Sequence, residues 1–248
     1  MVHGNKLTRR AVVILMCSTT WCLPLKAEER GEAAGKPSLP RVLLLGDSIS
    51  IGYTPFVQTM LESEAVVIRP TAASGNRAEN CAGTTNGVKH IDRWLKLGGG
   101  NWDVIHFNFG LHDLKRVMPD SGQNSNDPAD PRQAEPDVYE RQLREIAVKL
   151  KKTGANLIFC TTTPVPEGGV KPHRDVEDAQ RYNSIGRKIA QEVGADVNDL
   201  WAAAQPRLKE IQQPVNVHFT RDGSKYLADH VVQAIRKSLA AKRKAQTK

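Results

Sequence analysis

Arg41-Val-Leu-Leu-Leu-Gly-Asp-Ser-Ile-Ser50 is the stretch that decides the fold, because its run of branched aliphatic residues ends in a small, tight turn. Such a run, followed by the helix-compatible residues 51–61, is typical of a buried parallel strand that leads into a helix. The turn places Ser48 at the carboxyl end of the strand, beside a helix N-terminus, where ligands bind in open α/β sheets. Ser48 is therefore a candidate nucleophile, and a capping residue in an ordinary turn is the alternative.

Strand and helix patterns alternate five times along the chain. After the first strand, four apolar runs predict further strands at 65–69, 102–109, 156–161 and 195–197. Parallel strands need long crossover connections, so the pattern predicts a three-layer α/β/α sandwich with an open five-stranded parallel sheet. This single domain is expected to span residues 41–240, with helices between the strands, one of them over 200–211, and one at the C-terminal end.

Two long polar segments interrupt this alternation. The loop 70–86 is expected to form a wall of the site, because long loops in compact domains are usually functional. Residues 115–135 are polar and contain three prolines, which predicts an irregular, lid-like insertion. The active edge of the sheet should collect Ser48, the loop 70–86, residues 110–113 and the loop 161–173.

The N-terminus has the layout of a secretory signal peptide. Basic residues at 6, 9 and 10 precede the almost uncharged segment 11–25, and Lys26-Ala27 follows it. We expect cleavage after Ala27 and export to the periplasm or the extracellular space, with an uncleaved anchor as the alternative. The apolar part is short for a membrane span of about 20 residues, so no stable membrane insertion is expected after cleavage. Residues 28–40 are predicted to be a mobile lead-in.

The basic character of the chain does not indicate nucleic-acid binding. Its formal charge is +8, but four basic residues lie in the predicted signal peptide and six more lie in residues 236–248. The segment 28–235 is left at about −2 by the same count. The basic tail, residues 241–248, is interpreted as a solvated helix end rather than a contact for an anionic surface.

No metal or cofactor is expected. Only Cys81 and Cys160 follow the signal peptide, and no Cys/His spacing resembles a zinc site. Both cysteines are expected to stay unpaired, with Cys160 a small buried residue of a strand. The first loop lacks the Ser/Thr and Gly run that cradles a flavin phosphate, and the chain has no Gly-x-Gly-x-x-Gly pattern for a dinucleotide.

A serine needs a base and an oxyanion site before it can act as a nucleophile. Of the seven histidines, His218 follows an irregular stretch just before the last helix and should return to the active edge. His218 is therefore a candidate general base, with capping or packing as the alternative. Backbone N–H groups of Ser48 and Gly83 and the ring of His112 are candidate oxyanion donors.

These residues resemble the four ordered sequence blocks of the SGNH (GDSL-type) hydrolases. The resemblance rests on Gly46-Asp47-Ser48, a glycine in the second loop, Gly110-Leu-His-Asp113 and His218, and it covers most of residues 41–240. It implies a flavodoxin-like sheet, Ser48 as nucleophile and His218 as base. It also implies an oxyanion hole made by Ser48, Gly83 and His112. Asp47, Gly110, Asp113 and Asn216 are the predicted supporting residues.

The chain departs from that family pattern at three positions. His112 stands where the third block normally has asparagine, so the charge of this donor would depend on pH. Val215 stands where an aspartate usually orients the histidine, so a backbone carbonyl or Asn216 would have to orient His218. The second-block glycine is uncertain in register, and the N–H of Cys81 or Ala82 could replace that of Gly83.

The leading hypothesis is an exported serine esterase that removes small acyl groups from carbohydrate, with acetyl as the expected group. Its partner would be an acylated carbohydrate or another small ester. A lysophospholipase or thioesterase-like acyl hydrolase is the enzymatic alternative. A catalytically silent glycan-binding domain is the alternative from another class, because Val215 replaces the acid. The oligomeric state and the role of residues 115–135 stay open.

Overall fold

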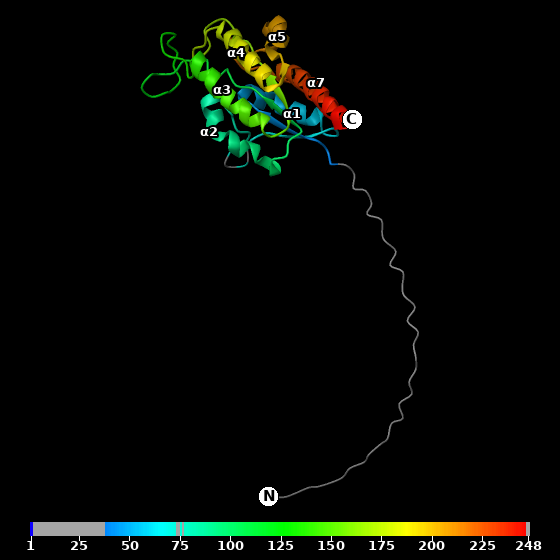
Figure 1. The fold of residues 1–248 in the computed structure, drawn as a ribbon. Helices are drawn as coiled ribbons and strands as arrows, with labels where there is room; N and C mark the ends of the chain where they lie inside the picture. Colours follow the sequence, from blue (N-terminus) through cyan, green and yellow to red (C-terminus); the bar gives the residue numbers. More distant parts are fainter. Residues whose placement is uncertain (2–37, 73–74, 76, 247–248) are drawn as a thin grey trace, which may run out of the picture. The chain divides into compact units, whose positions relative to one another are not determined.

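One parallel sheet of five strands forms the centre of the domain (Figure 1). The computed structural model describes Met1 and residues 38–72, 75 and 77–246. The strands are β1 Arg41–Leu45, β2 Val66–Ile68, β3 Val104–Phe107, β4 Asn156–Cys160 and β5 Asp196–Asn198. They lie in the order β2-β1-β3-β4-β5, which confirms the predicted flavodoxin-like arrangement. The strand order reverses between β1 and β3, and at such a switch point the crevice for a ligand opens.

Helices cover both faces of this sheet (Figure 1). The long ones are α1 Ser48–Met60, α2 Thr84–Leu95, α3 Pro136–Lys151, α4 Asp178–Val193 and α7 Arg221–Gln246. One layer pairs α1 with α7, and the other packs α2 against α3 and α3 against α4. The short elements are η1 Leu97–Gly99, α5 Leu200–Ala204, η2 Gln205–Arg207 and α6 Leu208–Ile211.

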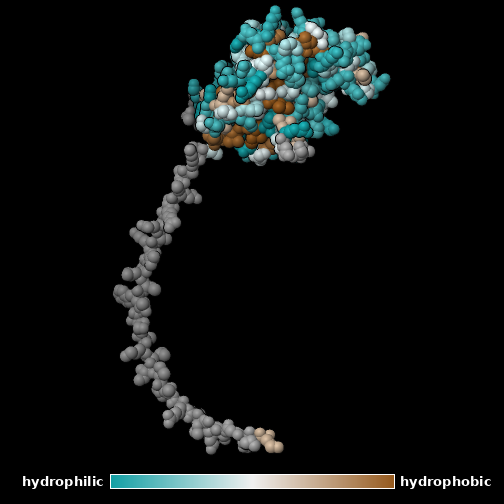
Figure 2. Space-filling model, turned by 180° about the vertical axis from the view of Figure 1, so that it is seen from behind, coloured by the Kyte–Doolittle hydropathy of each residue, from teal (hydrophilic) through white to brown (hydrophobic). Residues whose placement is uncertain are grey.

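The core lies between the sheet and the two helical layers. Val42 to Leu45 of β1 are at most 1% exposed, as expected for a central strand covered on both sides. Trp94, Tyr139 and Phe159 are among the largest fully buried side chains. The face in Figure 2 is mostly hydrophilic, with smaller hydrophobic patches. None of the helices in the described residues is long and apolar enough to span a bilayer.

Three sequence expectations differ in detail or fall outside the described residues. The helix predicted over 200–211 is broken into α5, η2 and α6 at Pro206, which has no N–H to continue the hydrogen-bond ladder. Helix α7 continues to Gln246, through most of the segment predicted as a tail, and Lys242 pairs with Asp103 at 2.9 Å. The predicted signal peptide, apart from Met1, and most of the lead-in lie outside the described residues.

The insertion 115–135 is tied to the segment that precedes α4. Arg116 pairs with Asp175, and Arg132 Nε lies 2.5 Å from Asp178 Oδ2. Backbone hydrogen bonds join Arg116 N to His173 O and His173 N to Ser125 O, each at 2.9 Å. The insertion and the segment 171–178 therefore form one structural unit beside the carboxyl edge of the sheet.

Candidate active site

The turn after β1 presents Ser48 at the start of α1. Asp47 is the N-cap residue, and its Oδ1 accepts a hydrogen bond from Ile49 N at 2.9 Å. Burial raises the pKa of Asp47, while the hydrogen bond from Ile49 N opposes that shift. Gly46 has no room for a side chain, because a Cβ there would lie 2.9 Å from Ser50 Oγ. Ser48 itself remains partly exposed at the carboxyl end of β1.

Arg69, which follows β2, forms hydrogen bonds with this turn and with the start of α1. Its role was not predicted from the sequence. Its Nη1 donates to Ser50 Oγ at 3.0 Å and Thr54 Oγ1 at 2.9 Å. Its Nη2 donates to Gly46 O at 3.2 Å and Glu79 O at 2.8 Å. A single buried guanidinium thus ties the nucleophile turn to the second loop.

The structure brings Ser48 and His218 together across 170 residues of chain. The distance between Ser48 Oγ and His218 Nε2 is 2.9 Å, which is hydrogen-bonding distance. His218 lies just before α7, and Gln212 and Phe219 on either side of its turn form an antiparallel bridge. This arrangement allows the imidazole to take the proton of the serine hydroxyl.

Asn216 orients the imidazole. Its Oδ1 lies 2.8 Å from His218 Nδ1 and accepts a hydrogen bond from His218 N at 3.0 Å. A backbone N–H can only donate, so the atom of Asn216 that it meets must be the amide oxygen. The ring Nδ1 must then carry the proton, which leaves Nε2 free to accept the proton of Ser48. The asparagine therefore selects the tautomer that a general base requires.

Val215 does not take part in this contact. Its side chain is 52% exposed, and its backbone has φ of 50°, a conformation that β-branched residues rarely adopt. Asn216, the next residue, forms an Asx turn with His218 instead. The contact expected from the usual acid is thus made by a neutral side chain one position later.

His112 lines the same cleft as Ser48 and His218. Burial lowers its pKa to about 3, and the positive charges of Lys115 and Arg174 lower it further in the same direction. At neutral pH the ring is therefore uncharged, so its charge does not vary over the usual working range. Neither ring nitrogen has a hydrogen-bond partner within the described residues, which leaves an N–H of the ring available to a ligand.

Asp113 joins the third block to the second. It is fully buried, and its Oδ1 accepts hydrogen bonds from Thr84 N at 2.7 Å and Thr84 Oγ1 at 2.5 Å. Burial raises the pKa of Asp113 to about 7, although both contacts with Thr84 act in the opposite direction. Gly83, the N-cap residue of α2, has no side chain to cap the helix, so Asp113 supplies that cap from another segment.

The three candidate N–H groups of the second block have different partners. Cys81 N donates to Gly46 O at 3.2 Å, and Ala82 N donates to Asn80 Oδ1 at 2.9 Å. Gly83 N has no hydrogen-bond partner within the described residues, but Gly83 is not among the residues that line the cleft. Asn80 does line it and was not predicted from the sequence.

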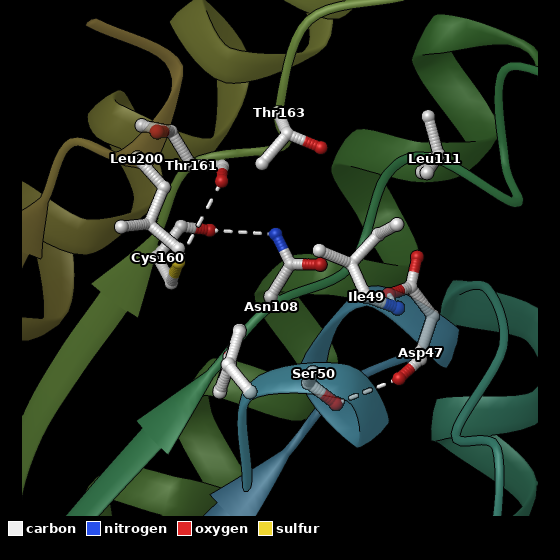
Figure 3. Close-up of a pocket in the computed structure, with 10 residues that line it drawn as sticks. Asp47, Ile49, Ser50, Asn108, Leu111, Cys160, Thr161, Thr163 and Leu200 are labelled. Carbon is white, nitrogen blue, oxygen red and sulfur yellow. Dashed lines mark hydrogen bonds between the residues drawn. The ribbon is translucent and has the colours of Figure 1, made fainter. Parts of the chain in front are cut away.

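The end of β3 is packed closely against β4. At Gly110, φ is 153° and a Cβ would lie 2.1 Å from Thr162 Oγ1, so only glycine fits there. Asn108 donates to Cys160 O at 2.8 Å (Figure 3). A cavity of about 10 Å³ lies between these strand ends and Asp47, with space for about one water molecule. It is too small for an acyl chain.

The cleft that contains Ser48 has a volume of about 340 Å³. It opens between the switch point of the sheet and the unit formed by residues 115–135 and 171–178. Besides the predicted residues, it is lined by polar or basic side chains that the sequence did not reveal: Asn80, Lys115, Asn124, Lys171 and Arg174. Three of its lining residues are apolar, namely Leu111, Pro172 and Val217.

Neither Cys81 nor Cys160 lines the cleft around Ser48. Cys81 and Cys160 are both buried and not disulfide-bonded. Burial raises the pKa of the Cys81 thiol to about 12, which makes it a poor nucleophile. Across the residues that the structure describes, no group of three His, Cys, Asp or Glu side chains could hold a metal ion.

Comparison with known proteins agrees with this geometry. The model of the GDSL-like lipase/acylhydrolase family matches residues 44–226. No curated protein matches the chain in sequence.

Three solved structures illustrate the similarity in fold. A lipase/acylhydrolase from Enterococcus faecalis has 19% sequence identity and a TM-score of 0.62, over 80% of this chain and 96% of that one. The acetylxylan esterase Axe2 from Geobacillus stearothermophilus has 17% identity and a TM-score of 0.60, over 79% and 94%. The acetyl xylan esterase AlAXEase has 18% identity and a TM-score of 0.58, over 79% and 99%.

Proposed function

The chain belongs to the GDSL-like lipase/acylhydrolase family and is a serine ester hydrolase, and on that premise we propose that it removes acetyl groups from carbohydrate by means of Ser48 and His218. The observation that carries the proposal is the 2.9 Å contact between Ser48 Oγ and His218 Nε2, with the tautomer of the ring selected by Asn216. The same contact favours a working enzyme over a silent glycan-binding domain, because the missing acid at Val215 is replaced.

In this mechanism Ser48 Oγ forms a bond to the ester carbonyl carbon while His218 Nε2 takes the hydroxyl proton. The oxyanion is held by the N–H of Ser48 and the neutral ring of His112, which both line the cleft, while the N–H of Gly83 stays a predicted third donor. The carbon–oxygen bond to the sugar then breaks, and His218 returns the proton to the departing alcohol. Water, deprotonated by His218, then attacks the acyl carbon. The bond between that carbon and Ser48 Oγ breaks, acetate leaves and His218 returns the proton to Ser48.

The cleft supports a short acyl group and a polar alcohol. Its apolar lining is limited to three residues, and the neighbouring internal cavity holds only about 10 Å³. Two of the structures with a similar fold are acetyl xylan esterases, which favours acetylated carbohydrate over a lysophospholipid or a thioester.

Hydrolysis of p-nitrophenyl acetate by the purified protein tests the proposal. We expect Ser48→Ala to lower kcat by about 10³-fold or more, because no other hydroxyl can replace the nucleophile. Ser184→Ala, an exposed serine on α4, is the matched control and should keep the wild-type rate. A fluorophosphonate probe should add its mass to the peptide that contains Ser48. Full activity of Ser48→Ala, or labelling at another residue, would contradict the proposal.

A second test concerns the acyl group and the compartment. Acetyl esters should be hydrolysed faster than butyryl or octanoyl esters of the same alcohol, and the opposite order would favour the lysophospholipase alternative.

The proposal includes export, because residues 1–27 have the layout of a signal peptide. N-terminal sequencing of the exported protein should begin at Glu28, whereas an intact Met1 would indicate an uncleaved anchor or no export.

A further inference from the structure

The cleft around Ser48 has an unbalanced positive charge. Its lining includes Lys115, Lys171 and Arg174 but no aspartate or glutamate. The other polar side chains in it are asparagines, two histidines and the serine itself. Two of the basic residues come from the segment before α4, and Lys115 begins the insertion.

Arg174 is the most informative of the three. Only 7% of it is exposed, and two of its nitrogens donate to backbone carbonyls, Nε to Leu111 O at 2.9 Å and Nη1 to Pro172 O at 3.0 Å. Its Nη2 has no hydrogen-bond partner within the described residues and is not among the fully enclosed unpartnered atoms. Arg174 therefore has a fixed orientation, and both N–H groups of its Nη2 are left without a partner in the described residues.

The electrostatics of Arg174 agree with an uncompensated charge. Burial lowers its pKa to about 10, and the charge of Asp47 only partly opposes this effect. Burial also lowers the pKa of Lys115, and the positive charge of Arg174 adds to the shift, while the charge of Asp113 partly opposes it. The two cations, which line the same cleft, therefore repel each other.

Nearby basic residues provide a contrast. Arg116 and Arg132, in the same insertion as Lys115, are both paired with carboxylates of the segment before α4. The carboxylates of Asp175 and Asp178 therefore neutralise these two arginines. Lys115, Lys171 and Arg174 have no carboxylate partner within 4 Å among the described residues. The three cleft cations lack that partner.

We propose that the cleft binds an anionic substrate, namely an O-acetylated acidic saccharide that carries a carboxylate or a sulfate close to its ester. The inference rests on the proposed function and specifies its substrate class. Carboxylate and sulfate both present oxygen acceptors that a guanidinium donor and two ammonium groups bind well. Because Arg174 and Ser48 line one cleft of about 340 Å³, the anionic group belongs to the acetylated sugar or its neighbour.

The test compares acetylated sugars that differ only in charge. Methyl 3-O-acetyl-glucuronide is paired with its neutral uronamide, and methyl 3-O-acetyl-glucoside 6-sulfate is paired with the unsulfated glucoside. We expect the anionic member of at least one pair to have a kcat/KM for acetate release about tenfold higher at low salt, with the advantage falling as salt rises. The pair with the larger ratio identifies the anion as carboxylate or sulfate.

Variants locate the effect in the cleft. The double variant with Lys115→Gln and Lys171→Gln should reduce the anionic-to-neutral ratio towards one. Lys237→Gln makes the same kind of charge change on an exposed part of α7, close to Ser238, whose carbonyl contacts the start of β4 at the opposite end of the sheet. This control should keep the ratio. A ratio near one in the wild type, or an equal ratio in the double variant, would overturn the inference.

Binding separates this inference from the proposed function. Calorimetry of the same four esters with Ser48→Ala should show tighter binding of the anionic member, whether or not the wild type hydrolyses esters. Hydrolysis of p-nitrophenyl acetate without any charge preference would leave the proposed function intact and refute the anionic substrate. A charge preference in binding without hydrolysis of any ester would support the anionic ligand and refute the proposed function.

Discussion

The two histidines of the cleft are held in opposite ways. Both ring nitrogens of His218 have partners, Ser48 Oγ on one side and Asn216 Oδ1 on the other. His112 has no ring partner within the described residues, and burial together with nearby cations lowers its pKa to about 3. Hydrogen bonds therefore determine the tautomer and direction of His218, whereas the surroundings of His112 determine its charge. A general base needs a fixed tautomer and direction, whereas a neutral oxyanion donor needs a ring that stays uncharged.

Among the substitutions that test this comparison, the largest effect should come from removing the neutral donor. His112→Ala should lower kcat by about 10²–10³-fold, the usual cost of losing one oxyanion donor. His112→Asn restores the family's usual amide and should stay within about tenfold of wild type. Since His112 is uncharged above about pH 3, the wild type and His112→Asn should have pH profiles of the same shape between pH 5 and 9. Steady-state kinetics measure both quantities. An unchanged kcat in His112→Ala would exclude His112 from the oxyanion site.

A smaller effect is expected from converting Asn216 into an acid. Asn216→Asp keeps the oxygen that meets His218 Nδ1 and adds a negative charge that stabilises the imidazolium formed during catalysis. We expect kcat/KM to rise by about tenfold and the acidic limb of the pH profile to move up by about 1 pH unit or more. Asn216→Ala, which removes the oxygen, should lower kcat instead. If both substitutions had the same effect, the contact between Asn216 and His218 would not orient the base.

The smallest effect concerns stability rather than rate, at the residue next to His112. The pKa of Asp113 is raised to about 7 in the folded protein from an ordinary value of 3.8, so the folded state binds more protons between these values. The stability that Asp113 contributes is thus present below about pH 4 and is lost as the pH rises towards 7.

Asp113→Asn tests this linkage, because the amide oxygen can still accept from Thr84 N while the titration is removed. From urea unfolding, the wild type should lose more free energy of unfolding between pH 5 and pH 8 than the variant, by roughly 1–3 kcal/mol. Parallel pH dependences in the two proteins would show that Asp113 does not titrate in this range.

Local sequence patterns were enough to predict the fold and the positions of the main candidates. The apolar run before Gly46 and the residues Gly110–Asp113 each follow a strand, and strand ends of a parallel sheet meet at one edge. His218 could be selected from seven histidines because it follows an irregular stretch just before the last helix. The roles of these residues in catalysis stay predictions until the variants are measured.

The residues that were missed depend on packing between distant segments. Arg69 contacts the carbonyl of Gly46 from 23 residues away, and Arg174 donates to Leu111 O from 63 residues away. No periodicity or motif marks such pairs in advance. The break of the predicted helix over 200–211 could have been predicted from the sequence alone. Pro206 lies within that range, and a proline interrupts a helix because it lacks a backbone N–H.

The sequence by itself determined the α/β/α sandwich, the family resemblance and the candidates Ser48 and His218, because these follow from hydrophobic periodicity and from residues adjacent to strand ends. Only the tertiary structure decided that Asn216 orients His218, that His112 is uncharged and that three cations face the cleft without a carboxylate. These properties depend on burial and on distances between segments that the chain brings together only on folding. Hydrogen-bond partners and pKa values follow from those surroundings, which the order of the residues does not reveal.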